Sequence, residues 1–180
     1  VFLFSCKQKK KDPEEAFFPV LSYLQSQATH MDTSLYNIRK IVPVDSTRND
    51  TLYLRREEFR AAASDFLSLP DLTASRYADR YVQTKTFDEM LNRVLMICTP
   101  VDPQREEIQR QEVLIKPDAE GGKVTNIIIQ TAKQTKDSLV EKRLLWQIGK
   151  SFQVTTTRQL LRQPETTSTF KVVWNEEANP

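Results

Sequence analysis

Residues 139–154 read LVEKRLLWQIGKSFQV, and this stretch decides the fold class. From 140 to 148 every second residue is apolar except Lys142, which is the alternation of a strand with one buried face. Gly149-Lys150 is a plausible tight turn, after which the alternation resumes at Phe152. A parallel return needs a crossover of a dozen or more residues, so these two strands are predicted to pair antiparallel.

The same pattern extends to both sides of this hairpin. Further strands are predicted over residues 93–101, 108–116, 123–133 and 170–174. The segment PDAEGG, residues 117–122, closes a turn between two of them. Because the chain has only 3 glycines, most hairpin turns must use Asp, Asn, Lys and Ser instead. The second half of the chain is therefore mostly antiparallel β-structure.

The first half carries helical signals around one further hairpin. Asp12-Pro13 starts a helix that runs to about Thr29, and Pro19 either bends this helix or marks a second start. Residues 35–44 and 51–54 form strands on either side of the polar turn DSTRND. An apolar stripe at helical spacing predicts a second helix over residues 55–68. The region 71–81 reads as a short helix and loop.

The elements combine into an α+β fold. We expect a curved antiparallel meander sheet of about five to seven strands, with the two helices of the N-terminal half packed on one face. With 180 residues and 20.9 kDa, one domain is the default expectation, and it spans residues 13–180. The mean hydropathy of −0.52, without any long apolar run, indicates a body that does not cross a membrane.

The basic residues of the chain are concentrated at one place near the start. Lys7, Lys9, Lys10 and Lys11 lie close together, and without them 22 basic side chains stand against 24 acidic ones. The folded part is therefore not a basic protein. This balance argues against a nucleic-acid partner.

A short apolar stretch, VFLFSC, precedes these lysines. Residues 3–6, LFSC, resemble the lipobox of bacterial lipoproteins, in which an aliphatic residue and a small residue precede a cysteine. The resemblance covers only about the first six residues and names no family for the rest of the chain. It implies that residues 1–5 are the remnant of a signal peptide and that the thiol of Cys6 carries a diacylglycerol. It also implies an acylated amino group, with fatty chains such as palmitate.

Two or more acyl chains attach a protein durably to a bilayer, whereas one gives only marginal binding. Each of the four lysines adds roughly 1 kcal/mol near anionic headgroups, and residues 6–12 form a basic tether. An aspartate directly after the cysteine favours retention in the inner membrane of some bacteria, and Lys7 stands there instead. The expected location is the outer membrane, facing the periplasm. The alternative interpretation is that VFLFSC is a first strand or a frayed end, with the lysines as a solvated tail.

No residue pattern points to catalysis, to a metal or to a cofactor. His30, the single histidine, stands at the end of the first helix, where a cation interacts well with the helix dipole. Cys98 lies in the apolar run VLMIC and is expected to be a buried, inert thiol. Trp146 and Trp174 stand on apolar strand faces and are expected in the core rather than in a ligand cleft.

The remaining candidates are acidic pairs and threonines. The pairs Glu57-Glu58, Asp88-Glu89 and Glu106-Glu107 are adjacent in sequence, diverge on any regular element, and read as solvated faces. The turns DSTRND and PDAEGG lack the ligand order of a calcium loop. Threonines at 155–157 and in TTSTF, residues 166–170, indicate a partly exposed sheet face that suits a protein or a glycan.

The function expected from these observations is that of a non-enzymatic cell-envelope lipoprotein. It would act through protein or ligand binding in the periplasm, anchored to the membrane by Cys6. One alternative is a periplasmic hydrolase whose Asp and Glu residues are brought together by folding. The other is an inhibitor or interaction module that docks through its sheet face or hairpins.

Overall fold

The computed structural model of the chain describes residues 16–119 and 121–175. The strands are β1 (Ile38–Pro43), β2 (Asn49–Leu54), β3 (Tyr81–Asp88), β4 (Arg93–Pro100), β5 (Ile108–Lys116), β6 (Lys123–Gln134), β7 (Ser138–Gln147), β8 (Ser151–Leu160) and β9 (Thr166–Val173). The helices are α1 (Val20–Thr33), α2 (Phe59–Ala62) and α3 (Ser64–Leu67), with 3₁₀ turns η2 (Arg56–Glu58) and η3 (Ser75–Tyr77).

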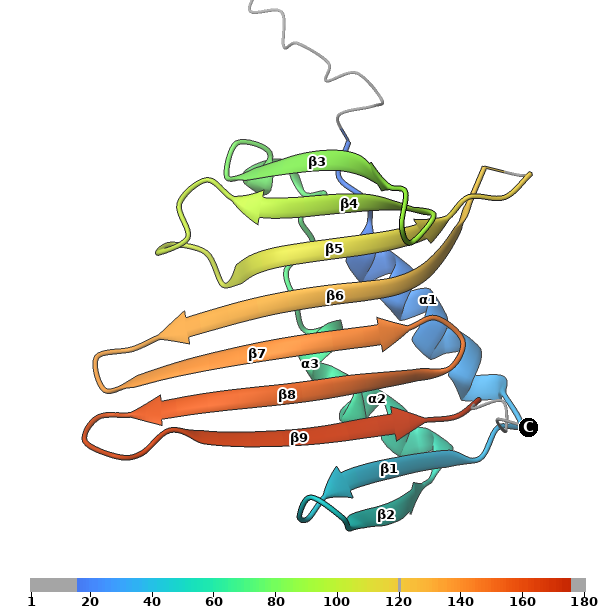
Figure 1. The fold of residues 1–180 in the computed structure, drawn as a ribbon, viewed down its shortest axis with the longest axis vertical. Coiled ribbons are helices and arrows are strands. Elements are labelled where there is room, and N and C mark those ends of the chain that lie inside the picture. Colours follow the sequence, from blue (N-terminus) through green and yellow to red (C-terminus); the bar gives the residue numbers. More distant parts are fainter. Residues whose placement is uncertain (1–15, 120, 176–180) are drawn as a thin grey trace, which may run out of the picture.

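All nine strands lie in one open antiparallel sheet, in the order β2-β1-β9-β8-β7-β6-β5-β4-β3 (Figure 1). Strands β3 to β9 form a continuous meander, and the hairpin β1–β2 is added beside β9. The predicted α+β meander is confirmed, but the sheet has nine strands instead of five to seven. Eight of the nine strands are predicted individually from the sequence, and the one missed is β3, an edge strand without clear alternation.

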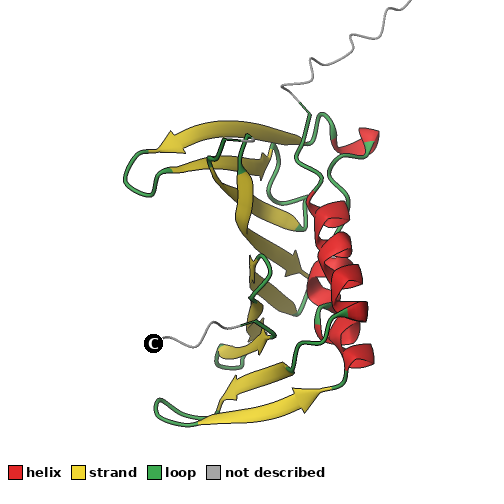
Figure 2. Cartoon of the chain, turned by 90° about the vertical axis from the view of Figure 1, so that its right-hand side faces the viewer, coloured by secondary structure: helices red, strands yellow, loops and turns green. Residues whose placement is uncertain are grey.

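The helices cover only one face of this sheet. Figure 2 shows α1 and the shorter helices together on one side, while the other side faces away from every helix. The sheet twists, and its end strands extend away from the helices, so that the uncovered side is curved (Figure 2). The two-layer arrangement with helices on one face follows the prediction. No element of residues 16–119 and 121–175 covers the other face of the sheet.

The core lies between the helices and the sheet, and aromatic rings fill its centre. Phe66 of α3 meets the indole of Trp146 edge-on at a centroid distance of 5.0 Å. The ring of Phe152 stacks on Trp146 at 5.1 Å, because these residues are directly opposite on β7 and β8. Trp174 packs on Phe59 at 5.2 Å. Both tryptophans are thus core residues, as predicted, with exposed fractions of 0% and 5%.

The first helix begins later than the first helical signal suggests. Pro19 occupies the N-cap position of α1, and Tyr23 donates the first regular backbone bond to the Pro19 carbonyl at 3.0 Å. Proline has no N–H to lose at a helix start, so Pro19 marks a beginning and does not bend a helix. The predicted start at Asp12-Pro13 lies outside the described residues. The helix continues to Thr33, one turn beyond the predicted end at Thr29.

The second predicted helix is present but interrupted. Ala63 has φ −89° and ψ 5° and separates α2 from α3. Phe59 and Phe66, which lie on either side of the break, are both fully buried against the sheet. Polar turns predicted from the sequence are formed as expected: in DSTRND, the carboxylate of Asp45 accepts the backbone N–H groups of Thr47 and Arg48, each at 2.9 Å.

Candidate functional site: the open face of the sheet

The sheet face opposite the helices, here called the open face, carries half-buried aliphatic side chains. On β7, Leu144 and Trp146 point into the core, so Leu145 between them points to the open face. The cross-strand register then assigns its partners to the same face. We call the resulting set the apolar row: Leu95, Ile97, Leu114, Ile128 and Leu145.

The apolar row is continuous across four strands. Leu95 lies directly opposite Leu114, and Ile128 lies directly opposite Leu145. Leu114 faces Asn126, which places it diagonal to Ile128, within reach of long side chains. The row therefore runs obliquely from β4 to β7 along the open face. None of its members belongs to the main core cluster, although all are partly shielded from solvent.

Two adjoining hollows lie beside the end of this row on β7. The larger has a volume of about 310 Å³ and is lined by Ile128, Arg143, Leu145, Gln153 and Thr155. The smaller, of about 260 Å³, is lined by Gln109, Gln130, Thr131, Ala132, Glu141, Lys142, Arg143, Thr155 and Thr157. Because Arg143 and Thr155 line both, the two hollows meet at this pair, which the register places opposite each other. Two of the five residues that line the larger hollow are aliphatic, whereas the residues that line the smaller one are polar or charged except for Ala132.

Arg143 is the charged group where the two hollows meet. Its side chain is exposed, and within residues 16–119 and 121–175 no ion pair or hydrogen bond to it is observed. Arg110, two strands away on the same face, is by contrast paired through Nε with the carboxylate of Glu112. Arg143 thus keeps its guanidinium donors available for a group outside this part of the chain.

The strand residues of the open face carry an excess of positive charge. The basic ones are Arg39, Arg93, Arg110, Lys116, Lys123, Arg143 and Lys171. The acidic ones are Asp88, Glu112 and Glu141. Seven basic groups against three acidic ones on a face of the described strands favour an anionic partner, even though the whole chain has a net charge of only +2.

Threonines border the hollows on the side of β9. The hydroxyl groups of Thr155 and Thr169 lie 3.0 Å apart, and those of Thr157 and Thr167 lie 3.3 Å apart. Both pairs are cross-strand neighbours on β8 and β9, and both point to the open face. The prediction of a partly exposed, threonine-rich sheet face is confirmed. Its connection with Arg143 and the apolar row could not be read from the sequence.

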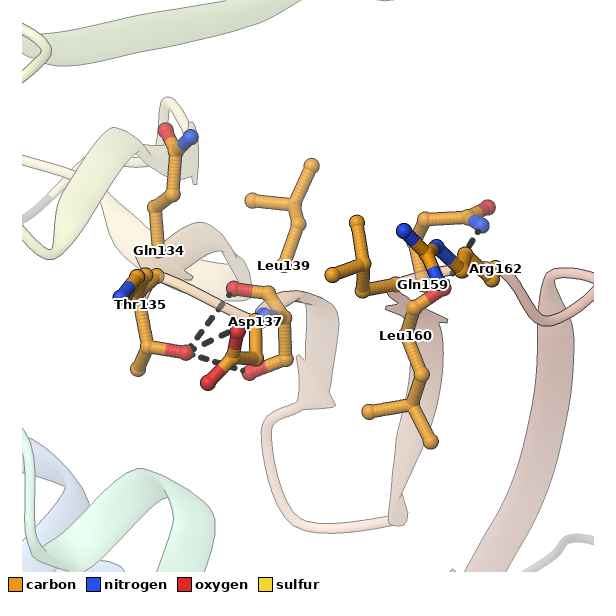
Figure 3. Close-up of a pocket in the computed structure, with 10 residues that line it drawn as sticks. Gln134, Thr135, Asp137, Leu139, Gln159, Leu160 and Arg162 are labelled. Carbon is orange, nitrogen blue, oxygen red and sulfur yellow. Dashed lines mark hydrogen bonds between the residues drawn. The ribbon is translucent and has the colours of Figure 1, made fainter.

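A third hollow, of about 240 Å³, lies where two hairpin turns meet at one end of the sheet (Figure 3). Its polar groups already bind one another: Thr135 Oγ1 lies 2.8 Å from Ser138 Oγ, and Gln159 donates to the Gln163 carbonyl at 2.8 Å. Leu139 and Leu160 line it as well. With its polar groups engaged in holding the turns, this hollow is the weaker candidate.

The residues predicted for membrane attachment lie outside the described part of the chain. These are Cys6, Lys7, Lys9, Lys10 and Lys11. The described chain starts beside β3: Gln83 donates to the Ala16 carbonyl at 3.0 Å and accepts from the Phe18 N–H at 3.1 Å. The membrane attachment therefore stays a prediction. The position at which the described chain joins the folded body is defined, and it lies beside β3.

His30 and Cys98 lie where the sequence placed them. His30 is exposed in the last turn of α1, next to the carbonyl end of the helix. Cys98 is 2% exposed on β4, and burial raises the pKa of its thiol from the ordinary value of 9.0 to about 11. The prediction that Cys98 is buried is confirmed. A thiol that stays protonated at neutral pH is a poor nucleophile.

The acidic pairs diverge, as predicted, but one of them is not a solvated face. Glu106 is only 8% exposed and lies 2.6 Å from Arg80 Nε, whereas Glu107 is exposed. The prediction that Glu106 is solvated is therefore wrong. The sequence pattern around Glu106 did not indicate its ion pair, because its partner Arg80 is 26 residues away in the chain. The nearby phenol of Tyr81 is buried and donates to the Ile108 carbonyl, and burial together with Glu106 raises its pKa.

The other two acidic pairs support local backbone structure. Glu58 accepts the Arg55 N–H at 2.7 Å, and Asp88 accepts the Leu91 N–H at 2.9 Å. Their neighbours Glu57 and Glu89 are exposed. No group of three or more His, Cys, Asp or Glu side chains that could hold a metal ion is found in the described ranges.

Among the described helices none is both long and apolar enough to cross a membrane. No family model, curated protein or solved structure matches the chain. The open face of the sheet, with its apolar row and Arg143, is the candidate site that the geometry itself provides.

Proposed function

We propose that the chain is a non-enzymatic binding module of the bacterial cell envelope, and that the open face of its sheet is the binding surface. The carrying observation is the sheet face that no described element covers, on which the half-buried apolar row ends beside Arg143, whose side chain has no ion pair or hydrogen bond among the described residues. Aliphatic surface that no element of the described chain covers is a common mark of an interaction site. A partner that covers the row removes this surface from water and can bind the guanidinium.

The composition of the hollows supports binding over hydrolysis. Hydrolysis by general acid–base catalysis with carboxyl groups requires two such groups directed at the same scissile bond. The two open-face hollows contain a single carboxylate, that of Glu141, which lines only the smaller one. The larger hollow offers an arginine, an amide, a hydroxyl and two aliphatic side chains. Such groups recognise a ligand and do not transfer protons.

The second part of the proposal is the lipid anchor at Cys6, with Lys7, Lys9, Lys10 and Lys11 adding attraction to anionic headgroups at the outer membrane. From Cys6 to Ala16 the chain spans at most ~35 Å when fully extended. Since Ala16 is bonded to Gln83 of β3, this tether would hold the β3 edge within that distance of the bilayer. The open face would then remain in the periplasm.

The anchor is tested in the native host. The wild-type protein is expected in the membrane fraction with a diacylated or triacylated N-terminal cysteine by mass spectrometry. A Cys6→Ala variant is expected to appear in the soluble fraction. Cys98→Ala is the matched control and should remain in the membrane, because its thiol is buried. Wild-type protein that begins at Val1 without modification would refute the anchor.

The binding surface is tested by covalent side-chain labelling of the Cys6→Ala protein. Detergent-solubilised envelope from the native host is separated into a protein fraction and a lipid fraction, and each is added alone. One fraction should protect Ile128 and Leu145 from labelling, while Leu35, which is 94% exposed near the end of α1, stays labelled. Protection by the protein fraction would favour an interaction module or inhibitor. Protection only on the helices, or no protection at all, would refute the proposal.

A further inference from the structure

We infer that the open face binds an anionic amphiphile, namely an aliphatic chain that ends in a carboxylate or a phosphate. Arg143 binds the acidic head, and the apolar row from Leu145 to Leu95 receives the chain. This inference rests on the proposed function and specifies the ligand of the same surface.

The head site is built from three neighbouring strands. The register places Gln130 of β6 and Thr155 of β8 on either side of Arg143. A guanidinium binds carboxylate or phosphate oxygens with two parallel N–H donors, and the flanking amide and hydroxyl add further donors. Thr155 is held in place by its contact with Thr169. The groups required for an oxyanion therefore meet at one point of the face.

The chain site begins directly at this point. Leu145 and Arg143 are two residues apart on β7 and share the larger hollow with Ile128. From there the apolar row crosses to β4, three strand spacings away, which corresponds to ~14 Å. The larger hollow of about 310 Å³ has room for about ten water molecules. An aliphatic chain in this place releases that water from half-buried leucine and isoleucine side chains.

The remaining features of the face favour this ligand over other classes. The seven basic and three acidic strand residues attract an anion without forming the dense basic surface that nucleic acids need. The five lining residues of the larger hollow include no aromatic ring on which a sugar could stack. Leu145 and Ile128, close to an arginine without an ion pair among the described residues, match a molecule with one charge and one aliphatic chain.

The test is calorimetric titration of the full chain carrying Cys6→Ala. The probes are dodecanoate, dodecyl phosphate and neutral dodecyl maltoside, each below its critical micelle concentration, together with acetate and inorganic phosphate. We expect one molecule of either long-chain anion per chain, with the neutral amphiphile binding at least about tenfold more weakly. Acetate and inorganic phosphate should not bind measurably. The relative affinity of the two anions distinguishes a carboxylate source from a phosphate source.

The variants separate the head site from the chain site. Arg143→Gln should weaken both anions about tenfold or more and leave the neutral amphiphile unchanged, while Leu145→Gln should weaken all three. Arg158→Gln, an exposed arginine of β8 on the other face, is the matched charge control. Met90→Gln is the control for non-specific hydrophobic binding, because Met90 is 97% exposed at the β3–β4 turn. Both controls should bind as wild type, and circular dichroism verifies that every variant is folded.

Equal affinity for charged and neutral amphiphiles, or an Arg143→Gln variant that binds the anions normally, would refute the inference. So would loss of binding in Met90→Gln as large as in Leu145→Gln. If no amphiphile binds but the envelope protein fraction protects Ile128 and Leu145, the inference fails while the proposed function stands. If amphiphiles bind and protect only the helices, both fail.

Discussion

The ammonium of Lys142 on β7 lies 2.6 Å from a carboxylate oxygen of Asp65 on α3. This contact ties the sheet to the helix layer and explains why a lysine interrupts the apolar alternation of residues 140–148. Lys142 points to the same side as Leu144 and Trp146, yet it reaches the edge of the helix layer and not its centre. The two side chains are 32% and 27% exposed, so the pair is only partly shielded from water.

The first prediction concerns this pair. A double-mutant cycle with Lys142→Met and Asp65→Asn should give a coupling energy of about 0.5–1 kcal/mol, because solvent screens a partly exposed ion pair. The free energy of unfolding is measured by urea titration at low salt, and high salt should reduce the coupling. A coupling energy of zero at low salt would show that the contact does not stabilise the protein.

The second prediction concerns the aromatic centre of the core. Phe66 is fully buried against Trp146 and Phe152, so Phe66→Ala leaves a cavity that the surrounding rings cannot fill. The expected loss of unfolding free energy is about 3–5 kcal/mol. Leu35→Ala is the control and should change stability by less than about 0.5 kcal/mol, since that side chain is 94% exposed. Similar losses in both variants would contradict the packing described here.

The third prediction concerns Arg80 and Glu106. Removing the guanidinium in Arg80→Gln leaves a carboxylate that is 8% exposed without its charged partner, and the expected cost is about 1–3 kcal/mol. Glu106→Gln should cost less, because the amide oxygen still accepts from Arg80. Urea titration of both variants gives the order. The reverse order would mean that Glu106 is better solvated than the geometry indicates.

The fourth prediction compares two neighbouring glycines in the β5–β6 turn. A Cβ on Gly122 would lie 2.7 Å from Ile115 Cγ2, whereas a Cβ on Gly121 would meet nothing within 4 Å. Both residues have positive φ, +115° for Gly121 and +126° for Gly122, so both substitutions by alanine are strained. Gly122→Ala should therefore lower the melting temperature clearly more than Gly121→Ala does. Equal shifts would show that Ile115 moves aside without cost.

The fifth prediction concerns alkaline pH. Burial raises the pKa of Cys98 to about 11 in the folded protein, while the unfolded thiol ionises near its ordinary value of 9.0. Between these values the unfolded state has lost a proton that the folded state keeps, so stability falls as pH rises. The contribution of the protonated Cys98 thiol to the free energy of unfolding is fully present below pH 9 and is lost above about pH 11.

The measurement is the unfolding free energy of the Cys6→Ala protein and of its Cys98→Ala derivative at pH 8 and pH 10.5. Cys98→Ala should lose less stability between these pH values than its parent, by on the order of 2 kcal/mol. Comparing the two proteins cancels the titration of lysines and tyrosines, which they share. Parallel pH profiles would mean that the thiol is not protected by burial.

The sheet could be predicted wherever one side of a strand enters the core. In β7 and β8 the period-two pattern is strong because Leu144, Trp146, Phe152 and Val154 all face the helices. The pattern is absent in β3, YVQTKTFD, where only the first residue is buried. An edge strand beyond the helix layer has little reason to alternate, and hydrogen bonding to β4 alone defines it.

The candidate site was much less accessible from the sequence. Arg143 follows two other charged residues in the run EKR, residues 141–143, which reads as ordinary solvated surface. Its place in the candidate site depends on which sheet face the helices leave open. It also depends on the cross-strand neighbours Thr155 and Gln130, which are 12 and 13 residues away in the chain. The apolar row likewise takes one or two residues from each of four strands, and each residue alone looks like a partly buried strand position. The cross-strand register brings these residues together on the open face. Hydrophobic periodicity within a strand predicts which residues face the core, but it does not predict which residues of neighbouring strands lie side by side on the opposite face.

Strand β1 pairs with β9, so the first hairpin of the chain is completed by its last strand. During synthesis, β1 and β2 leave the ribosome long before Val172 and the rest of β9 are made. Until then, the edge of β1 that pairs with β9 has no partner strand. A chain released early would lack Trp174 and would present two unpaired strand borders, at β1 and at β8, to any other nascent chain. The nine-stranded sheet of the described residues is therefore completed only after β9 has been synthesised, because β9 joins the β1–β2 hairpin to the meander.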